Sequence, residues 1–399
     1  MFQFGVLSAL VTALTSVLSA VLLLALTRTL WSLRWSLTRD KDSSLPLPKG
    51  SMGWPLVGET FHWLFQGSNF HISRRERHGN VFKTHLLGKP VIRVTGAENI
   101  RKILLGEHSL VCTQWPQSTR IILGPNTLVN SIGDLHKRKR KILAKVFSRG
   151  ALESYLPRLQ DVVKQELQKW CLEEGSVDVY SAAKALTFRI AMRVLLGLQL
   201  EEERLLYLAR TFEQLMNNLF SLPIDAPLSG LRKGIKAREI LHAHMEKIIE
   251  EKMERPQTEE YNDAFDYMLS SAKEHGHTLS IQELKGYQIP KGWSVMYSIR
   301  DTHETAAVFQ NPQQFDPDRF GPEREESRAS RFSYVPFGGG VRSCVGKELA
   351  QIILKTLAVE LIGTMSWTLA TEDFPKMQTV PIVHPVNGLH VNFRYSHAL

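Results

Sequence analysis

The stretch that decides the fold reads Phe337-Gly-Gly-Gly-Val-Arg-Ser-Cys-Val-Gly346, and Lys347-Glu-Leu-Ala-Gln-Ile-Ile-Leu-Lys-Thr-Leu follows it directly. Apolar residues at positions 349, 352, 353, 357, 358 and 361 recur at helical spacing, which predicts an amphipathic helix that begins just after Cys344. The N-terminus of a helix presents free backbone N–H groups and a positive dipole end, which favour a thiolate there. Glycines at 338–340 and 346 let the backbone approach a flat cofactor without Cβ clashes. The stretch therefore predicts a thiolate at the mouth of a helix, on a backbone that a flat cofactor can approach closely.

Five positions of this stretch follow the pattern F-x-x-G-x-R-x-C-x-G, namely Phe337, Gly340, Arg342, Cys344 and Gly346. This pattern resembles the cysteine loop of the cytochrome P-450 superfamily at every fixed position. The resemblance implies haem (iron protoporphyrin IX) as the cofactor, bound by this loop with Cys344 as the iron ligand. Arg342 lies within reach of a haem propionate. A cysteinate pushes electron density onto haem iron and favours O–O cleavage, and backbone N–H donors to the sulfur tune that push.

Two other interpretations of the glycine-rich stretch compete with a haem loop. A phosphate-binding P-loop would need G-x-x-x-x-G-K-[ST], whereas position 341 is valine and position 348 is glutamate, which excludes that motif. A buried structural cysteine in a glycine turn stays open as the alternative, because cysteine is often buried for packing alone.

Two further motifs resemble the same superfamily. The segment Phe315-Asp-Pro-Asp-Arg-Phe320 is similar to the meander upstream of the cysteine loop, in which the arginine, here Arg319, closes a salt-bridged triad with an E-x-x-R pair. The segment His136-Lys-Arg-Lys-Arg140 is similar to the W-x-x-x-R pattern whose residues bind haem propionates. Positions i and i+4 share a helix face, so His136 and Arg140 are both candidates to contact the cofactor. A solvated basic face remains the alternative for this run.

Six further stretches resemble the retinoic-acid hydroxylase subfamily, namely LPLPKGSMGWPLVGET, FKTHLLGKPVIRVTGAEN, ILLGEH, FSLPID, GYQIPKGW and SIRDTHETA. The resemblance implies a microsomal monooxygenase that hydroxylates retinoic acid or a related retinoid. It further implies electrons from NADPH, delivered by the flavoprotein cytochrome P-450 reductase. Trp115, Phe220 and Leu222 are the positions that the resemblance assigns to the wall of the retinoid pocket, and Arg93 is its candidate partner for the substrate carboxylate. The alternative is that the aromatic residues belong to the core and the arginine to the surface.

The 399-residue chain begins with an apolar segment that is long enough to cross a bilayer. Residues 1–27 carry no charge, and about 20 predominantly apolar residues span the hydrocarbon core. Arg28, Arg34, Arg39 and Lys41 follow, which places this flank in the cytosol, and Trp31 and Trp35 suit an interface. A signal-anchor is therefore expected at residues 1–27, with membrane lipid as a partner and the haem domain on the cytosolic face of the endoplasmic reticulum membrane. A cleaved signal peptide would need its basic residues before the apolar run.

The rest of the chain has the composition of a globular protein, with 43% hydrophobic and 22% charged residues. Residues 28–58 form a basic flank and a Pro/Gly-rich hinge, and residues 59–399 are expected to form the haem domain. Strands are expected at 81–87 and 90–95, a short helix at 97–105, mainly helix from 135 to 284 and a loop at 220–230. The predicted class is mainly α with a small β lobe. The net charge of +9 is accompanied by no nucleic-acid-binding motif, so no nucleic-acid partner is expected.

Two motifs of the cytochrome P-450 superfamily have no counterpart at their places in this sequence. The [AG]-G-x-[DE]-T motif of the central helix does not occur, and the E-x-x-R helix is absent from its place just before the stretch GYQIPKGW. The E-x-x-R strings at Glu98/Arg101, Glu201/Arg204 and Glu325/Arg328 lie elsewhere along the chain. Residues 280–285 are similar to the lead-in to the central helix, whereas residues 286–290 are similar to a strand well beyond it. The two segments are joined without a linker, which predicts an internal deletion near 285/286 that removes the haem-wall helix and the E-x-x-R helix.

Such a deletion has physical consequences for the fold and for catalysis. One face of the haem loses its cover, neighbouring helices lose apolar burial, and Arg319 is expected to lose its ion-pair partners. Proton delivery to dioxygen loses its donor, so no catalytic residue is assigned. Two hypotheses remain: a retinoic-acid hydroxylase in which an active remnant survives, and a non-catalytic truncated variant that at most binds haem or retinoid.

Overall fold

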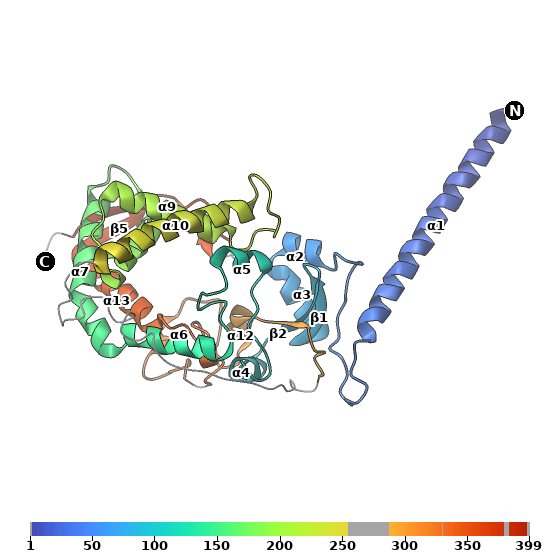
Figure 1. Cartoon of the computed structure of the whole chain (residues 1–399), viewed down its shortest axis with the longest axis horizontal. Coiled ribbons are helices and arrows are strands. Elements are labelled where there is room, and N and C mark those ends of the chain that lie inside the picture. Colours follow the sequence, from blue (N-terminus) through green and yellow to red (C-terminus); the bar gives the residue numbers. More distant parts are fainter. Residues whose placement is uncertain (1, 254–286, 329, 379–382, 397–399) are drawn as a thin grey trace. The chain divides into compact units, whose positions relative to one another are not determined.

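The computed structural model describes the chain except for residues 1, 254–286, 329, 379–382 and 397–399 (Figure 1). The chain divides into two compact units, the first made of Met1–Val111 and Ser280–Ser343 and the second of Cys112–Leu279 and Cys344–Leu399. The described strands form three small sheets, and helices make up most of the remaining regular structure. The prediction of a mainly α protein with little β structure is confirmed. The expected junction at 285/286 lies outside the described residues.

Helix α1, Phe2–Ser36, is continuous over 35 residues. The sequence predicts an anchor that ends at residue 27, but the helix continues through Arg28 and Arg34, because residues 28–36 contain neither proline nor glycine. Within the part of the chain that the structure describes, α1 holds the one stretch long and apolar enough to cross a membrane, Val11–Ser36.

The last turns of α1 contact the remainder of the first unit through two tryptophans. The indole N–H of Trp31 donates to the carbonyl of Met52 at 3.2 Å, and its ring lies edge-on to His85 with centroids 5.1 Å apart. The Trp35 ring lies 5.4 Å from that of Trp31 and 5.8 Å from that of Trp293. The two residues that the sequence offers as interfacial anchors therefore also join α1 to the sheet that follows.

The first unit is built on a three-stranded sheet in the order β1-β2-β4. Strands β1, Val81–Leu86, and β2, Lys89–Val94, form an antiparallel hairpin, and β4, Ser294–Tyr297, adds parallel to β2. Leu87 (φ +50°) and Gly88 (φ +77°) close the two-residue turn, whose left-handed conformation matches the twist of the strands. The two predicted strands are confirmed.

Short helices pack around this sheet. They are α2 (Thr60–Gln66), α3 (Ser68–His78), α4 (Ala97–Leu105) and α12 (Ile299–Thr305), with 3-10 turns at Pro317–Phe320 and Gly340–Arg342. Helix α4 has the bounds that the sequence predicts, and it buries Ile100 and Leu104 against Phe332 and Val335. This small core lies just before the cysteine loop in sequence, so it fixes where the loop begins.

The second unit is mainly helical. Its helices are α5 (Gln117–Leu123), α6 (Gly133–Val146), α7 (Arg149–Leu172), α8 (Val179–Ile190), α9 (Glu202–Asn218), α10 (Gly230–Met253) and α13 (Lys347–Thr364), with a π-helical turn at Ala191–Leu195. Strands β3 (Val177–Asp178), β8 (His390–Tyr395) and β5 (Met365–Leu369) form one sheet, and β6 (Met377–Gln378) pairs with β7 (His384–Pro385). The predicted helical region and the loop at 220–230 are confirmed for the described residues.

The largest apolar core of this unit lies between α7 and α13. Leu159, Val163 and Leu167 of α7 are fully buried in it, together with Leu349 of α13. Ile352, Ile353, Leu357 and Leu361 pack against the same core. Removing a side chain of this size from water contributes about 1.5–3 kcal/mol, so this contact is a principal reason why α13 forms where it does.

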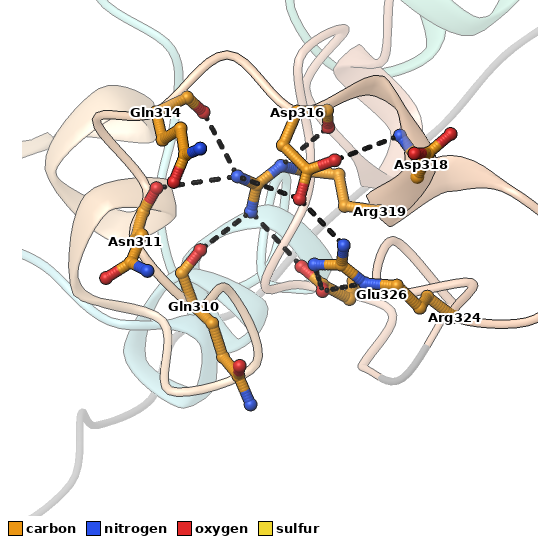
Figure 2. A network of polar contacts seen from close by, with 8 residues as sticks. All are labelled: Gln310, Asn311, Gln314, Asp316, Asp318, Arg319, Arg324 and Glu326. Carbon is orange, nitrogen blue, oxygen red and sulfur yellow. Dashed lines mark hydrogen bonds and ion pairs between the residues drawn. The ribbon is translucent and has the colours of Figure 1, made fainter.

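Arg319 is buried, and the structure gives it partners (Figure 2). Its guanidinium donates to Glu326 Oε2 at 3.2 Å. It also donates to the backbone carbonyls of Gln310, Asn311, Gln314 and Asp316 at 3.1–3.4 Å. The expectation that Arg319 loses its ion pair is therefore wrong: a carboxylate seven residues further along the chain and four local carbonyls satisfy it.

Replacing Arg319 by alanine is expected to lower the free energy of unfolding by about 3 kcal/mol, because four backbone carbonyls and Oε2 of the largely buried Glu326 lose the donor that Arg319 supplies. Arg324 still donates to Oε1 of Glu326, so that carboxylate keeps one partner. Urea unfolding of the full-length protein in detergent, followed by tryptophan fluorescence, measures the change. Arg328→Ala is the control, since the Arg328 side chain is 78% exposed in its ion pair with Glu325 and should contribute less than about 1 kcal/mol. Equal losses for the two variants would contradict the buried role of Arg319.

Candidate functional site

The cysteine loop ends at the N-terminus of α13. The 3-10 turn Gly340–Arg342 leads through Ser343 to Cys344, whose side chain is exposed, and α13 begins at Lys347. The expected helix just after the cysteine is confirmed, and its predicted apolar face is the one that packs on α7. Because that face is held by the core, the residues just before it are presented at the surface of the second unit.

The glycines of the loop serve two different purposes. Gly340 has φ +61°, and a Cβ there would lie 2.0 Å from the carbonyl oxygen of Leu104, so the loop backbone rests directly on the end of α4. Gly338 also has a positive φ, +70°, but a Cβ there would meet only one atom within 4 Å, at 3.9 Å. Gly346 faces open space, since a Cβ would meet no atom within 4 Å. Close packing of the backbone therefore requires a glycine at position 340, whereas a side chain at position 346 would meet open space.

Arg342, the expected partner of a haem propionate, contacts a carboxylate of the protein itself. Its Nε–H donates to Glu107 Oε1 at 3.0 Å, and the two side chains are 16% and 8% exposed. Glu107 lies in the turn after α4, inside the stretch ILLGEH. The resemblance of that stretch to the retinoic-acid hydroxylases assigns no role to its glutamate, so the sequence alone did not indicate this contact. Only the docking of the loop on α4 brings the two residues together.

His136 and Arg140 both lie on α6, one helical turn apart. His136 is buried and Arg140 is half-buried. Val146, the last residue of α6, belongs to the same apolar core as Leu349 in the first turn of α13. The helix that carries the two candidate propionate partners is thus joined, through one core, to the helix that follows Cys344.

These residues fit a thiolate-bound haem on the cysteine side. Cys344 is exposed, Gly346 leaves open space next to it, and Phe337 lies half-buried at the start of the loop. The set supplies one sulfur ligand and cationic side chains for acidic substituents, which is the donor chemistry that a cysteine-ligated haem requires. Among the described residues, no group of three or more His, Cys, Asp or Glu side chains is arranged to hold a metal ion.

Two of the residues expected to wall a retinoid pocket lie close together in the second unit. The rings of Trp115 and Phe220 have centroids 6.5 Å apart. The hydroxyls of Ser118 and Thr119 both donate to the carbonyl of Leu219, at 2.9 and 2.7 Å, which fastens α5 to the residue next to Phe220. Leu222 lies in the loop between α9 and α10, and the residue is 67% exposed. The structure therefore brings the two aromatic side chains together and leaves Leu222 open to solvent.

Arg93, the candidate partner of a substrate carboxylate, is a buried residue of β2. Its guanidinium donates to Asp301 Oδ2 of α12 at 3.4 Å. Burial lowers the pKa of Arg93, and the Asp301 carboxylate opposes that shift. The pKa of the neighbouring His71 falls to about 3, first because of burial and then because of the Arg93 charge. In this structure Asp301, which sequence reasoning did not single out, is the acid that compensates the arginine.

Comparison with known proteins decides the family. The sequence profile of the cytochrome P450 family matches residues 48–286 and 282–393. The chain belongs to the cytochrome P450 family. Human cytochrome P450 26C1 is 49% identical over 470 aligned positions, which cover 90% of each protein. Cytochrome P450 26B1 of Xenopus tropicalis is 47% identical over 450 positions, which cover 89% of this chain and 88% of that protein.

Solved structures of this family share the fold. The retinoic acid bound cyanobacterial CYP120A1 superposes with a TM-score of 0.79 and 28% sequence identity, over 89% of this chain and 100% of that one. The cytochrome P450 OleT variant in complex with arachidonic acid, at 16% identity and a TM-score of 0.71, is similar in fold alone. The fold predicted from the cysteine loop is therefore confirmed.

The alignment with the human P450 has more positions than the number of residues that this chain contributes to it. It has 470 aligned positions, whereas 90% of the 399 residues supplies only about 360, so about 110 positions have no residue of this chain opposite them. The two family matches end and begin at residues 282–286, around the predicted junction at 285/286. The interrupted match thus falls where the sequence alone indicates a deletion.

Gly340→Ala is expected to destabilise the protein by more than about 2 kcal/mol, because it combines a left-handed conformation with a collision against the Leu104 carbonyl. Gly338→Ala shares the positive φ but meets no close atom, so it should cost about 1 kcal/mol. Urea unfolding of both variants in the haem-free state measures the difference. Equal costs would show that the close approach to α4 is not a constraint on the loop.

Proposed function

We propose that this cytochrome P450 binds haem through Cys344 and that the site is that of a haem-thiolate monooxygenase. The observation that carries the proposal is the exposed Cys344 at the mouth of α13, with open space beside Gly346. Haem bound by a cysteinate supplies the oxygen-activating chemistry. The chain's own residues would hold the cofactor: Cys344 as the iron ligand, with His136, Arg140 and Arg342 as donors to its propionates.

The substrate class that we propose is retinoic acid or a related retinoid, hydroxylated with electrons from NADPH by way of cytochrome P450 reductase. The resemblance of the sequence to retinoic-acid hydroxylases supports this proposal, as does the similarity to a cyanobacterial P450 that binds retinoic acid. The Trp115–Phe220 pair offers apolar surface for a polyene chain. Arg93 stays the candidate partner for the retinoid carboxylate. Asp301, which accepts from Arg93 in this structure, would compete with that carboxylate for the guanidinium.

The same proposal includes a membrane anchor. Residues 1–27 would form the signal-anchor, residues 28–58 a basic flank and hinge, and the haem domain would face the cytosol at the endoplasmic reticulum. The apolar stretch of α1, followed by Arg28, Arg34, Arg39 and Lys41, supports this orientation by the positive-inside rule.

A second candidate function, binding of haem or retinoid without turnover, is favoured for this chain by three observations. About 110 aligned positions of the human relative have no counterpart, and the sequence lacks the motif that delivers protons to dioxygen. In addition, α13 exposes Leu354, Val359 and Ile362 by 62%, 69% and 73%, an apolar face without cover in the described chain. A chain that lacks both a cover for this face of α13 and the proton donor to dioxygen is expected to bind haem or retinoid without hydroxylating the retinoid.

The ferrous–carbon monoxide complex of the full-length protein tests the haem site. A red-shifted Soret band, typical of thiolate ligation, is expected after expression with a haem precursor, and Cys344→Ser should abolish it. Cys112→Ser is the matched control, since Cys112 is also exposed but lies outside the loop. No such band in the parent protein, or an undiminished band in Cys344→Ser, would overturn the assignment of Cys344.

Turnover separates the two candidate functions. Purified protein in membranes with reductase, NADPH and retinoic acid is expected to form less than about 1% of the product made by human cytochrome P450 26C1, because loss of general acid–base assistance alone costs about 10²–10⁴-fold. Chromatography of the retinoid products measures the ratio. Turnover near that of the human protein would establish the monooxygenase and refute the non-catalytic alternative.

A further inference from the structure

The turn after α4 holds Glu107 in a defined backbone position. The carbonyl of Gly106 accepts hydrogen bonds from the N–H groups of Ser109, Leu110 and Val111, and the N–H of His108 donates to the carbonyl of Val111 at 2.9 Å. His108 has φ +70° although it carries a side chain, and it is buried. A non-glycine residue persists in this region only when its surroundings determine it, and such strain clusters at functional sites.

The side chain of Glu107 points to the cysteine loop. Its Oε1 accepts the Nε–H of Arg342 at 3.0 Å and lies 3.7 Å from Nδ1 of His108. Glu107 and Arg342 are 8% and 16% exposed, so the pair is largely removed from water. A charge-assisted hydrogen bond in such surroundings is stronger than one at the surface and fixes the orientation of the planar guanidinium.

A second contact holds the cysteine loop against α4. The backbone at Gly340 lies against the carbonyl of Leu104, and Leu104 in turn packs on Phe332 and Val335 just upstream of the loop. The 3-10 turn Gly340–Arg342 is thus held at one end by close backbone packing and at the other by the Glu107–Arg342 ion pair.

We propose that Glu107 is a positioning residue for the haem loop: it fixes Arg342, two residues before Cys344, so that the loop is ordered before haem binds. The proposal goes beyond the cysteine-loop motif, because Glu107 lies far from that loop in sequence and contacts it only in the folded chain. Its cofactor part rests on the proposed binding of haem by Arg342 and Cys344. Its structural part, the ordering of residues 338–343, is independent of haem.

Hydrogen exchange of the haem-free full-length protein tests the structural part. The reporters are the N–H groups of Gly338 and Ser343, which donate to the carbonyls of Val335 and Gly340. Glu107→Gln keeps the shape but removes the charge, and it is expected to raise exchange in residues 338–343 about tenfold, since local opening sets the rate. Glu98→Gln is the control, because Glu98 pairs with Arg101 at the exposed surface of α4, and it should leave this exchange unchanged.

A double variant guards against a general loss of folding. Glu107→Gln leaves the Arg342 charge buried, whereas Glu107→Gln combined with Arg342→Gln removes both charges and should fold like the parent by circular dichroism. Fast exchange of residues 338–343 in both variants, but not in Glu98→Gln, supports the proposal. Unchanged exchange in the double variant, or an equal rise in Glu98→Gln, overturns it.

Haem titration of the same proteins tests the cofactor part. Glu107→Gln is expected to weaken haem binding about tenfold relative to the parent and to Glu98→Gln, because the loop must then be ordered on binding. Equal affinity despite faster exchange would overturn the role of Glu107 in haem binding. If the parent itself binds no haem, the proposed haem function fails, and the hydrogen-exchange result still decides whether Glu107 orders the loop.

Discussion

Burial of one face of α13 against α7 is the constraint on which the cysteine loop depends. Leu349 and the apolar residues that follow it at helical spacing must leave water, and α7 supplies the surface that covers them. This contact sets where α13 begins and therefore presents Cys344 just outside its first turn, exposed and next to the open space at Gly346. The position of the proposed thiolate ligand thus follows from the packing of an apolar core.

Buried cations impose the second constraint, and the first unit satisfies it internally. Three buried or nearly buried arginines each meet a carboxylate: Arg93 with Asp301, Arg319 with Glu326, and Arg342 with Glu107. Removing one member of such a pair leaves an uncompensated charge, which is why each carboxylate matters as much as its arginine. Arg342 was expected to bind a haem propionate and Arg93 a substrate carboxylate. Such ligands would compete with the protein carboxylates of Glu107 and Asp301 for these arginines.

The local elements were predictable because their signals are local. The strands around Gly88 follow from a turn dipeptide between β-prone runs, and the bounds of α4 and the start of α13 follow from apolar periodicity. Helix α1 extends beyond the apolar run, which ends at residue 27, since nothing in residues 28–36 interrupts a helix. The partners of Arg319 were not foreseen, because four of them are backbone carbonyls, which carry no side-chain identity.

The sequence by itself determined the family and singled out the cysteine expected to bind iron, because both are encoded by residue types at fixed spacing along the chain. It also predicted a deletion near 285/286, because two segments that resemble separate parts of the family are joined there without a linker. Only the tertiary structure decided which side chains meet: Glu107 and Arg342 are 235 positions apart, and Arg93 and Asp301 are 208 apart. No periodic pattern links residues at such separations. Their pairing arises when α4 and β2 pack on segments from the far end of the chain, where the loss of water makes an unpaired charge too costly to leave.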